Sequence, residues 1–139
     1  MNINLDDIYI GMELPKLYKN PSTRQLVQYA GASFDYYEIH YDKDVAQKNN
    51  LPGVIVHGAL KAAFFGELIT KWMEPKGKLL KLSIQYKGMD IPGDELIITG
   101  KVNKIESLPN SMIVYCSLWV ENSSMERTTT GSGVIELPI

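Results

Sequence analysis

Apolar and polar residues alternate along the second half of the chain with the two-residue period of a β-strand. Four segments carry this pattern and predict antiparallel strands: 79–87, 94–106, 111–121 and 127–137. The apolar face of the first is expected to hold Leu80, Leu82, Ile84 and Tyr86, and that of the third Met112, Val114, Cys116, Leu118 and Val120. Leu108, Pro109 and Asn110 predict a hairpin turn, and Gly100 indicates a bulge or bend in the second strand.

The most strongly helical pattern covers residues 58–74. Its apolar residues occupy a broad arc of a 3.6-residue wheel, and the narrower opposite arc holds Glu67, Thr70, Lys71 and Glu74. A helix of this kind is mostly buried. Ala62 and Gly66 are neighbours on the apolar arc, so a second backbone, such as a sheet, is expected to approach there.

Shorter elements are expected before this helix. Residues 12–19 favour a short strand, and Ser22 is placed to cap a helix that runs to about Ala30 and buries Leu26, Val27 and Ala30. Residues 31–41 have no clean period and predict a loop, after which Asp42 is expected to cap another short helix. Helices followed by strands indicate the α+β class, with a curved antiparallel sheet around the long helix.

Composition narrows the class of protein further. The 139 residues predict one domain over 1–139, and 45% hydrophobic with 22% charged residues is ordinary for a globular protein. A net charge of −2 and no basic stripe make a nucleic-acid partner unexpected. The amino terminus does not resemble a secretory signal, and charged residues interrupt the apolar stretch 59–73, so we expect a cytoplasmic protein with no membrane partner. The single Cys116 excludes a disulfide framework within the chain and a cysteine zinc cluster.

Asp35 and His40 are the first candidates for chemistry, because they lie five residues apart in one irregular segment. A carboxylate and an imidazole that share a water form a general acid/base unit, since both can accept a proton near pH 7. The spacing alone favours the alternative in which Asp35 caps a turn and His40 is partly exposed.

His57 and Gly58 stand where a β-branched run enters the long helix. The first amide of a helix points outward in a positive field and suits a developing oxyanion, and glycine permits close approach of a substrate. Gly58 fits this role and the role of a sharp turn equally well, whereas for His57 capping or packing that orients the turn is favoured.

Other polar residues favour structural roles. Asp90 and Asp94 flank Pro92 and Gly93 in turn chemistry, and both are expected to be solvated or bonded to the turn backbone. Glu67 and Lys71 are spaced for a solvated i,i+4 pair, and Cys116 has the inward phase of a core residue. No metal-ligand cluster or phosphate-binding loop is apparent in the sequence.

Taken together, these motifs resemble those of the MaoC-like hydratases, the (R)-specific enoyl-CoA hydratase group. The resemblance rests on Asp35, His40, the hydrophobic entry to His57 and Gly58, and Pro92-Gly93-Asp94 as a strand-opening turn. It implies a hot-dog fold, a homodimer or higher oligomer or a heteromer, and reversible syn addition of water to a trans-2-enoyl-CoA thioester. It also implies that Asp35 and His40 activate the water, that Gly58 polarises the thioester carbonyl, and that no metal or other cofactor is used.

The chain departs from the family pattern at two places. Tyr36, Tyr37 and Glu38 stand where many members have Asn-Pro, and Gly66 stands where some have serine. Both changes alter the expected pocket but leave the acid/base pair. Two other functions stay open: a hot-dog thioesterase, for which Glu67 is badly placed, and a non-catalytic or partner-dependent subunit of a heteromeric hydratase.

Overall fold

The computed structural model describes residues 4–73 and 75–139. The helices are α1 (Thr23–Ser33), α2 (Lys43–Lys48) and α3 (Gly58–Met73), with short 3-10 helices at Leu5–Asp7 and Glu38–His40. The strands are β1 (Leu17–Lys19), β2 (Lys78–Tyr86), β3 (Leu96–Ser107), β4 (Ser111–Glu121) and β5 (Arg127–Pro138). They form one antiparallel sheet in the order β1-β3-β4-β5-β2, which confirms the expected α+β architecture.

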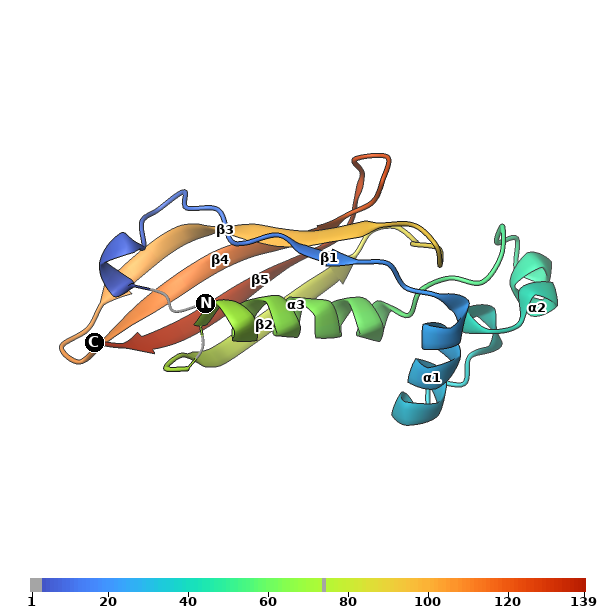
Figure 1. Ribbon diagram of the computed structural model, residues 1–139, viewed down its shortest axis with the longest axis horizontal. Helices are drawn as coiled ribbons and strands as arrows, with labels where there is room; N and C mark the ends of the chain where they lie inside the picture. Colours follow the sequence, from blue (N-terminus) through green and yellow to red (C-terminus); the bar gives the residue numbers. More distant parts are fainter. Residues whose placement is uncertain (1–3, 74) are drawn as a thin grey trace.

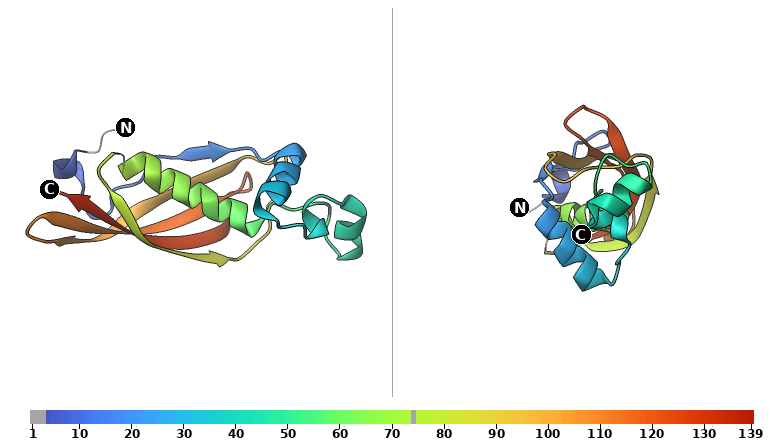
Figure 2. Two further views of the ribbon diagram at one scale, coloured as in Figure 1. Left: turned by 90° about the horizontal axis from the view of Figure 1, so that it is seen from below. Right: turned by 90° about the vertical axis from the view of Figure 1, so that its right-hand side faces the viewer.

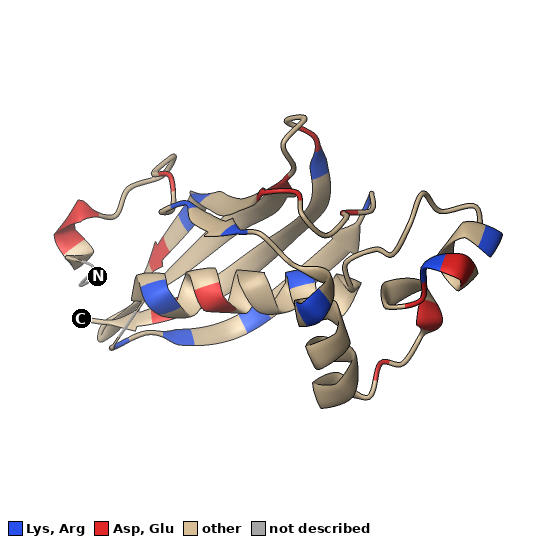
Figure 3. Ribbon diagram, turned by 45° about the vertical axis from the view of Figure 1, so that its right-hand side comes forward, with Lys and Arg blue, Asp and Glu red and all other residues tan. Residues whose placement is uncertain are grey.

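Helix α3 lies along the inner face of the sheet, which curves around it, and α1 and α2 lie beyond one end (Figures 1 and 2). Phe65 and Ile69 are fully buried and join a single apolar core with the strands. This confirms the predicted buried helix up to Met73; Glu74 lies outside the described residues. No helix among the described residues is long and apolar enough to cross a bilayer. Charges of both signs are interspersed over the elements (Figure 3).

The close approach between helix and sheet is not where we expected it. Nothing lies within 4 Å of a Cβ built on Gly66. The small residues are instead on β5, where a Cβ on Gly131 would lie 3.2 Å from the Phe65 ring and one on Gly133 would lie 2.9 Å from Ile69. The expectation for Gly66 was wrong because the large side chains of α3 reach across to glycines of the sheet.

Two strand details also differ from the expectations. A register shift between Leu79 and Lys81 reverses the phase at the start of β2, so that Leu80 is exposed. Tyr86 is exposed as well, at the far end of the strand. In β3 the irregularity lies between Val102 and Lys104, and Gly100 pairs regularly with Leu118. Glycine is required at position 100 for another reason, because a Cβ there would overlap the carbonyl of Ser117 on β4.

The amino-terminal elements begin as predicted but end elsewhere. Ser22 Oγ accepts a hydrogen bond from the Gln25 amide at 3.1 Å, which confirms the cap, but α1 continues to Ser33. Leu26 and Ala30 are buried, whereas Val27 is exposed. Asp42 caps α2 as expected. Of the strand expected over 12–19, only Leu17–Lys19 belongs to β1, with one isolated bridge at Glu13.

Candidate active site

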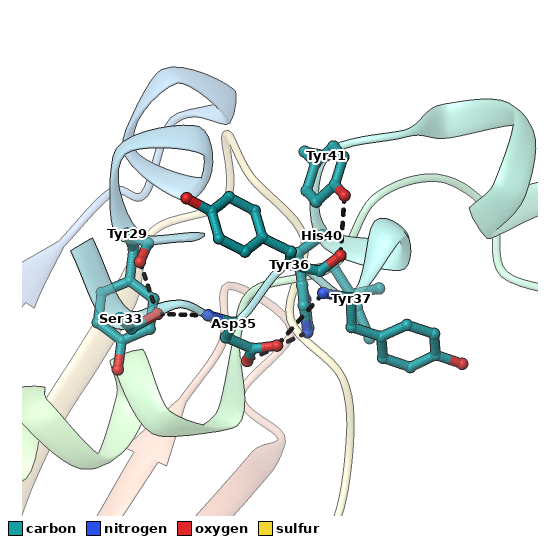
Figure 4. A network of polar contacts seen from close by, with 8 residues as sticks. Tyr29, Ser33, Asp35, Tyr36, Tyr37, His40 and Tyr41 are labelled. Atoms are coloured by element: carbon teal, nitrogen blue, oxygen red, sulfur yellow. Dashed lines mark hydrogen bonds and ion pairs between the residues drawn. The ribbon is translucent and has the colours of Figure 1, made fainter. Parts of the chain in front are cut away.

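The end of α1 sets the position of the Asp35 carboxylate. Phe34 ends the helix in the left-handed conformation, with φ of 60°, which turns the chain sharply. The Ser33 hydroxyl donates to the Tyr29 carbonyl at 2.6 Å and accepts from the Asp35 amide at 3.2 Å. Figure 4 shows the carboxylate held by this turn beside His40, with Tyr36, Tyr37 and Tyr41 around the pair.

His40 is fixed from the other side by the segment that leads into α3. Its side chain is buried, and its Nδ1 lies 2.8 Å from the Ile55 carbonyl oxygen. A carbonyl oxygen only accepts, so Nδ1 carries the proton of the neutral ring and Nε2 keeps its lone pair. The ring is thereby set in the tautomer that a general base requires.

The free nitrogen of His40 faces Asp35. Nε2 and Asp35 Oδ2 are 4.0 Å apart, which is too long for a direct hydrogen bond. One water can contact both atoms at an ordinary hydrogen-bond distance of about 2.8 Å. The Asp35 side chain is 41% exposed, so solvent reaches this place. The structure thus brings together the two residues that the sequence singled out, in an arrangement that suits a shared water.

His57 packs flat against His40. The ring centroids are 3.8 Å apart and the planes differ by 22°, while Tyr29 meets the His57 ring edge-on at 4.8 Å. Burial lowers the pKa of His57, the neighbouring His40 lowers it further, and Asp35 opposes this. His57 is therefore a neutral spacer that supports the His40 ring, in keeping with the packing role favoured for it.

Gly58 begins α3 directly after His57. Its N–H has no backbone acceptor within the described ranges, as is general for the first turn of a helix. A Cβ at this position would lie 2.9 Å from the ring of Tyr86 on β2, so the aromatic ring takes the space of a side chain. The amide is thus free for a ligand, as the oxyanion role requires, and glycine is needed here because the Tyr86 ring packs against it, a reason that the sequence did not indicate.

The same residues form a poor metal site. Ligand atoms of Asp35, His40 and His57 lie within 4.8 Å of one another. Stacked imidazole rings, however, point their in-plane lone pairs side by side, whereas two ligands of one ion must converge on it. His40 Nδ1 is also bonded to the Ile55 carbonyl. The geometry fits proton transfer to a water better than it fits metal coordination.

Comparison with known proteins bears on this arrangement. The family model described as "MaoC like domain" matches residues 11–118, more than half of the chain. The chain belongs to the MaoC-like domain family. Comparison with curated proteins found no match.

Solved structures place this MaoC-like domain in the hot-dog fold. An (R)-hydratase from A. caviae involved in PHA biosynthesis is 22% identical with a TM-score of 0.86, over 95% of this chain and 98% of that chain. The R-hydratase PhaJ1 from Pseudomonas aeruginosa is 23% identical with a TM-score of 0.85, over 99% of this chain and 90% of that one. The ChsH1-ChsH2 complex from Mycobacterium tuberculosis contains a chain that is 16% identical with a TM-score of 0.83, over 93% and 98% of the two chains. The expected fold is confirmed.

The MaoC-like domain has an apolar pocket of about 380 Å³, and His40 is one of the residues that line it. Its wall is made by α1, by the segment before α3 and by the turn before β3; the lining includes Thr23, Val27, Tyr41, Val54, Ile91 and Pro92. This location explains why Val27 is exposed, although the sequence pattern predicts burial. Asp35 does not line the pocket, so His40 is the member of the pair that borders both the water position and the apolar space.

Glu67 and Cys116 are structural in this MaoC-like domain. Glu67 is bonded to Lys19 at 2.6 Å and to Lys71 at 2.7 Å, and these hydrogen bonds, that from Lys19 first, lower the pKa of its carboxyl. The i,i+4 pair is thus confirmed, with Lys19 as an additional partner. Burial raises the pKa of the Cys116 thiol to about 12, which confirms its core position.

The interpretation of Asp90 as a solvated turn residue is wrong. Its side chain is fully buried and its Oδ2 lies 3.0 Å from the Nζ of Lys61 on α3. Sequence reasoning also missed Lys61, although a lysine in the apolar stretch 59–73 was the signal. Its partner lies 29 positions further along the chain, and only the tertiary structure brings the two together.

Proposed function

We propose that this MaoC-like domain is an acyl-CoA hydratase/dehydratase that adds water reversibly, in the syn sense, to a trans-2-enoyl-CoA thioester. The product is a 3-hydroxyacyl-CoA. One observation carries the proposal: the Nε2 lone pair of His40 faces the Asp35 carboxylate across a space that one water can bridge. The names of the (R)-hydratases that share the fold give it further support.

In the proposed mechanism, a water lies between Asp35 Oδ2 and His40 Nε2. As its oxygen forms the new bond to C3, one O–H bond breaks and the proton passes to Nε2, while the Asp35 carboxylate stabilises the imidazolium. The electrons of the C2–C3 double bond move toward the thioester, and the Gly58 N–H stabilises the developing enolate oxygen. The pair then returns the proton to C2 on the face where the water was held, which gives syn addition.

The decisive test is an assay of the purified protein against trans-2-enoyl-CoA thioesters of graded chain length. We expect loss of the enoyl absorbance with formation of 3-hydroxyacyl-CoA and no release of free CoA. Release of free thiol from saturated acyl-CoA, without hydration, would instead establish a thioesterase. The position of Glu67 in a surface ion-pair network disfavours that outcome.

The apolar pocket beside His40 is the proposed site of the acyl chain. Val27→Trp would fill part of it, because Val27 lines the wall from α1. We expect this variant to lose about tenfold or more in kcat/KM for the longest accepted thioester, since two lost methylene contacts are worth about 1.6 kcal/mol, and to retain activity on the shortest. Equal loss at every chain length would place the acyl chain elsewhere.

We further propose that the functional unit contains more than one chain. Strand β2 ends the sheet, and its outer edge has no partner strand in the described part of the chain. An edge of this kind is a template for pairing with another chain. A heteromeric hydratase is the second candidate, because one similar structure is a ChsH1-ChsH2 complex. Protein that is inactive alone and becomes active with a partner would favour it over the homo-oligomer.

A further inference from the structure

A buried ion pair lies one turn inside α3 from Gly58. Lys61 Nζ is 3.0 Å from Asp90 Oδ2, and the two side chains are 2% and 0% exposed. The Thr128 hydroxyl donates to the same carboxylate oxygen at 2.6 Å, and Lys61 also donates to the Gly88 carbonyl at 3.2 Å. The cluster of Lys61, Asp90 and Thr128 therefore joins α3, β5 and the turn before β3.

A contribution to the stability of the fold does not by itself explain why this cluster is buried. Two charges lose their hydration when they are buried, and apolar residues of similar volume often serve the folded state equally well or better. Lys61 also stands near the amino-terminal end of α3, where the helix dipole disfavours a cation. The contacts of the cluster with its surroundings offer a different reason.

The cluster contacts the chain before and after the peptide bond that joins His57 to Gly58. Before it, the Val56 N–H donates to the Asp90 carbonyl at 2.8 Å. After it, the Lys61 ammonium lies 5.9 Å from the centroid of the Tyr86 ring, and that ring covers the Cα of Gly58. Asp90 thus makes two contacts with this region. The backbone carbonyl of Asp90 holds the segment that enters α3, and the carboxylate of Asp90 holds the first turn of α3.

We propose that Lys61, Asp90 and Thr128 are positioning residues that hold the Gly58 N–H at the place of the enolate oxygen. The inference rests on the proposed hydration. Because the enolate charge exists only near the transition state, a displaced amide lowers kcat and leaves substrate binding almost unchanged. A purely structural cluster would instead affect the unfolding midpoint without changing kcat of the folded protein.

The test compares two double variants on the same helix. Lys61→Met with Asp90→Leu removes both buried charges, and Lys71→Met with Glu67→Leu makes the same changes in the surface pair. For the first we expect a kcat at least tenfold lower with KM within twofold, since a misplacement of about 1 Å costs up to about 10²-fold. For the second we expect kcat within twofold of the wild type. The ¹⁵N–¹H resonance of Gly58 should move in the first variant only.

Unchanged kcat and an unmoved Gly58 resonance in the folded Lys61/Asp90 double variant would overturn the inference. If that variant does not fold, Thr128→Val removes a single hydroxyl of the cluster and is expected to lower kcat about threefold with KM unchanged; unchanged kcat there would overturn it equally. A wild-type protein that hydrates no enoyl thioester would instead defeat the proposed function. The Gly58 resonance then decides alone whether the cluster positions this amide.

Discussion

Asp35 and Asp90 each face a nitrogen atom of a basic side chain, but the two carboxylates differ in exposure and in distance to that nitrogen. Asp35 is 41% exposed and lies 4.0 Å from His40 Nε2, with aromatic side chains around it. Asp90 is fully buried and lies 3.0 Å from Lys61 Nζ, with the Thr128 hydroxyl on the same oxygen. One pair leaves space for a small molecule between its atoms, and the other has no such space.

The difference separates a reactive pair from a fixed one. The short Lys61–Asp90 contact already joins its donor to its acceptor, and burial keeps a substrate away from both. Asp35 and His40 keep unused lone pairs that face each other and solvent, so a water can enter and lose a proton. We therefore expect substitutions at the open pair to lower the rate of reaction most, with little change in stability. Substitutions at the closed pair should lower the stability of the fold strongly and the rate of reaction less.

The largest effect is expected at the open pair. Asp35→Asn and His40→Gln should each lower kcat/KM for enoyl-CoA hydration by about 10²–10⁴-fold, because general acid/base catalysis contributes that much. Asp35→Asn should change the free energy of unfolding by only about 0.5 kcal/mol, as is usual for a half-exposed side chain. Steady-state kinetics and urea unfolding check both expectations. Asp44→Asn, on the surface of the neighbouring α2, is the matched control and should keep activity within twofold.

For Asp90→Asn the largest expected effect is on stability. The substitution leaves the Lys61 charge buried without its counter-ion, so the free energy of unfolding should fall by about 3–5 kcal/mol. Urea unfolding monitored by circular dichroism measures the change. Glu67→Gln should have a much smaller effect, because it weakens an ion pair near the surface of α3, the helix that also carries Lys61. A similar loss in both variants would show that the buried pair is not special.

At His57 we expect a smaller effect, on the pH dependence of the free energy of unfolding. Burial holds its pKa below the ordinary value of 6.5, so the native state binds fewer protons than the unfolded chain as the pH falls through that value. The contribution to stability is complete above pH 6.5 and is lost progressively below it. In His57→Gln, unfolding free energy should depend less on pH between about 7.5 and 5.5. Parallel curves for the two proteins would contradict a neutral buried His57.

The smallest effect is expected at Cys116. Because burial raises the pKa of its thiol to about 12, an aromatic disulfide reagent at about pH 8 should not label the native protein. In urea the single cysteine should react with one equivalent. Labelling of the native protein would show that β4 opens. The result also matters for the thioesterase assay, since a silent Cys116 leaves released CoA as the only thiol detected.

Local signals predicted the parts of this molecule that lie close together in sequence. The Ser22 and Asp42 caps were predicted because the side chain and the amides it caps are two or three residues apart. The convergence of Asp35 and His40 was predicted as a possibility for the same reason. The tautomer of His40 could not be predicted, because it depends on the carbonyl of Ile55, which is 15 residues away.

Tertiary contacts account for the errors. Asp90 looks like a solvated turn residue in its own segment, and nothing near Lys61 in the sequence shows which charge it pairs with. Only the packing of α3 on the turn before β3 makes them partners. Leu80 has the inward phase in an ideal strand, and one register shift is enough to expose it. Val27 lies on the apolar side of α1, yet it borders a pocket and not the core.

Phe34 makes one surface position unusually demanding. Its side chain is 83% exposed, but its backbone occupies a region in which an ordinary L-residue is strained by about 1 kcal/mol. Tolerance at this position is therefore governed by the torsion angle and hardly at all by polarity or size. Glycine and asparagine fit it, whereas valine and isoleucine would push the chain out of its turn and carry the adjoining carboxylate with it.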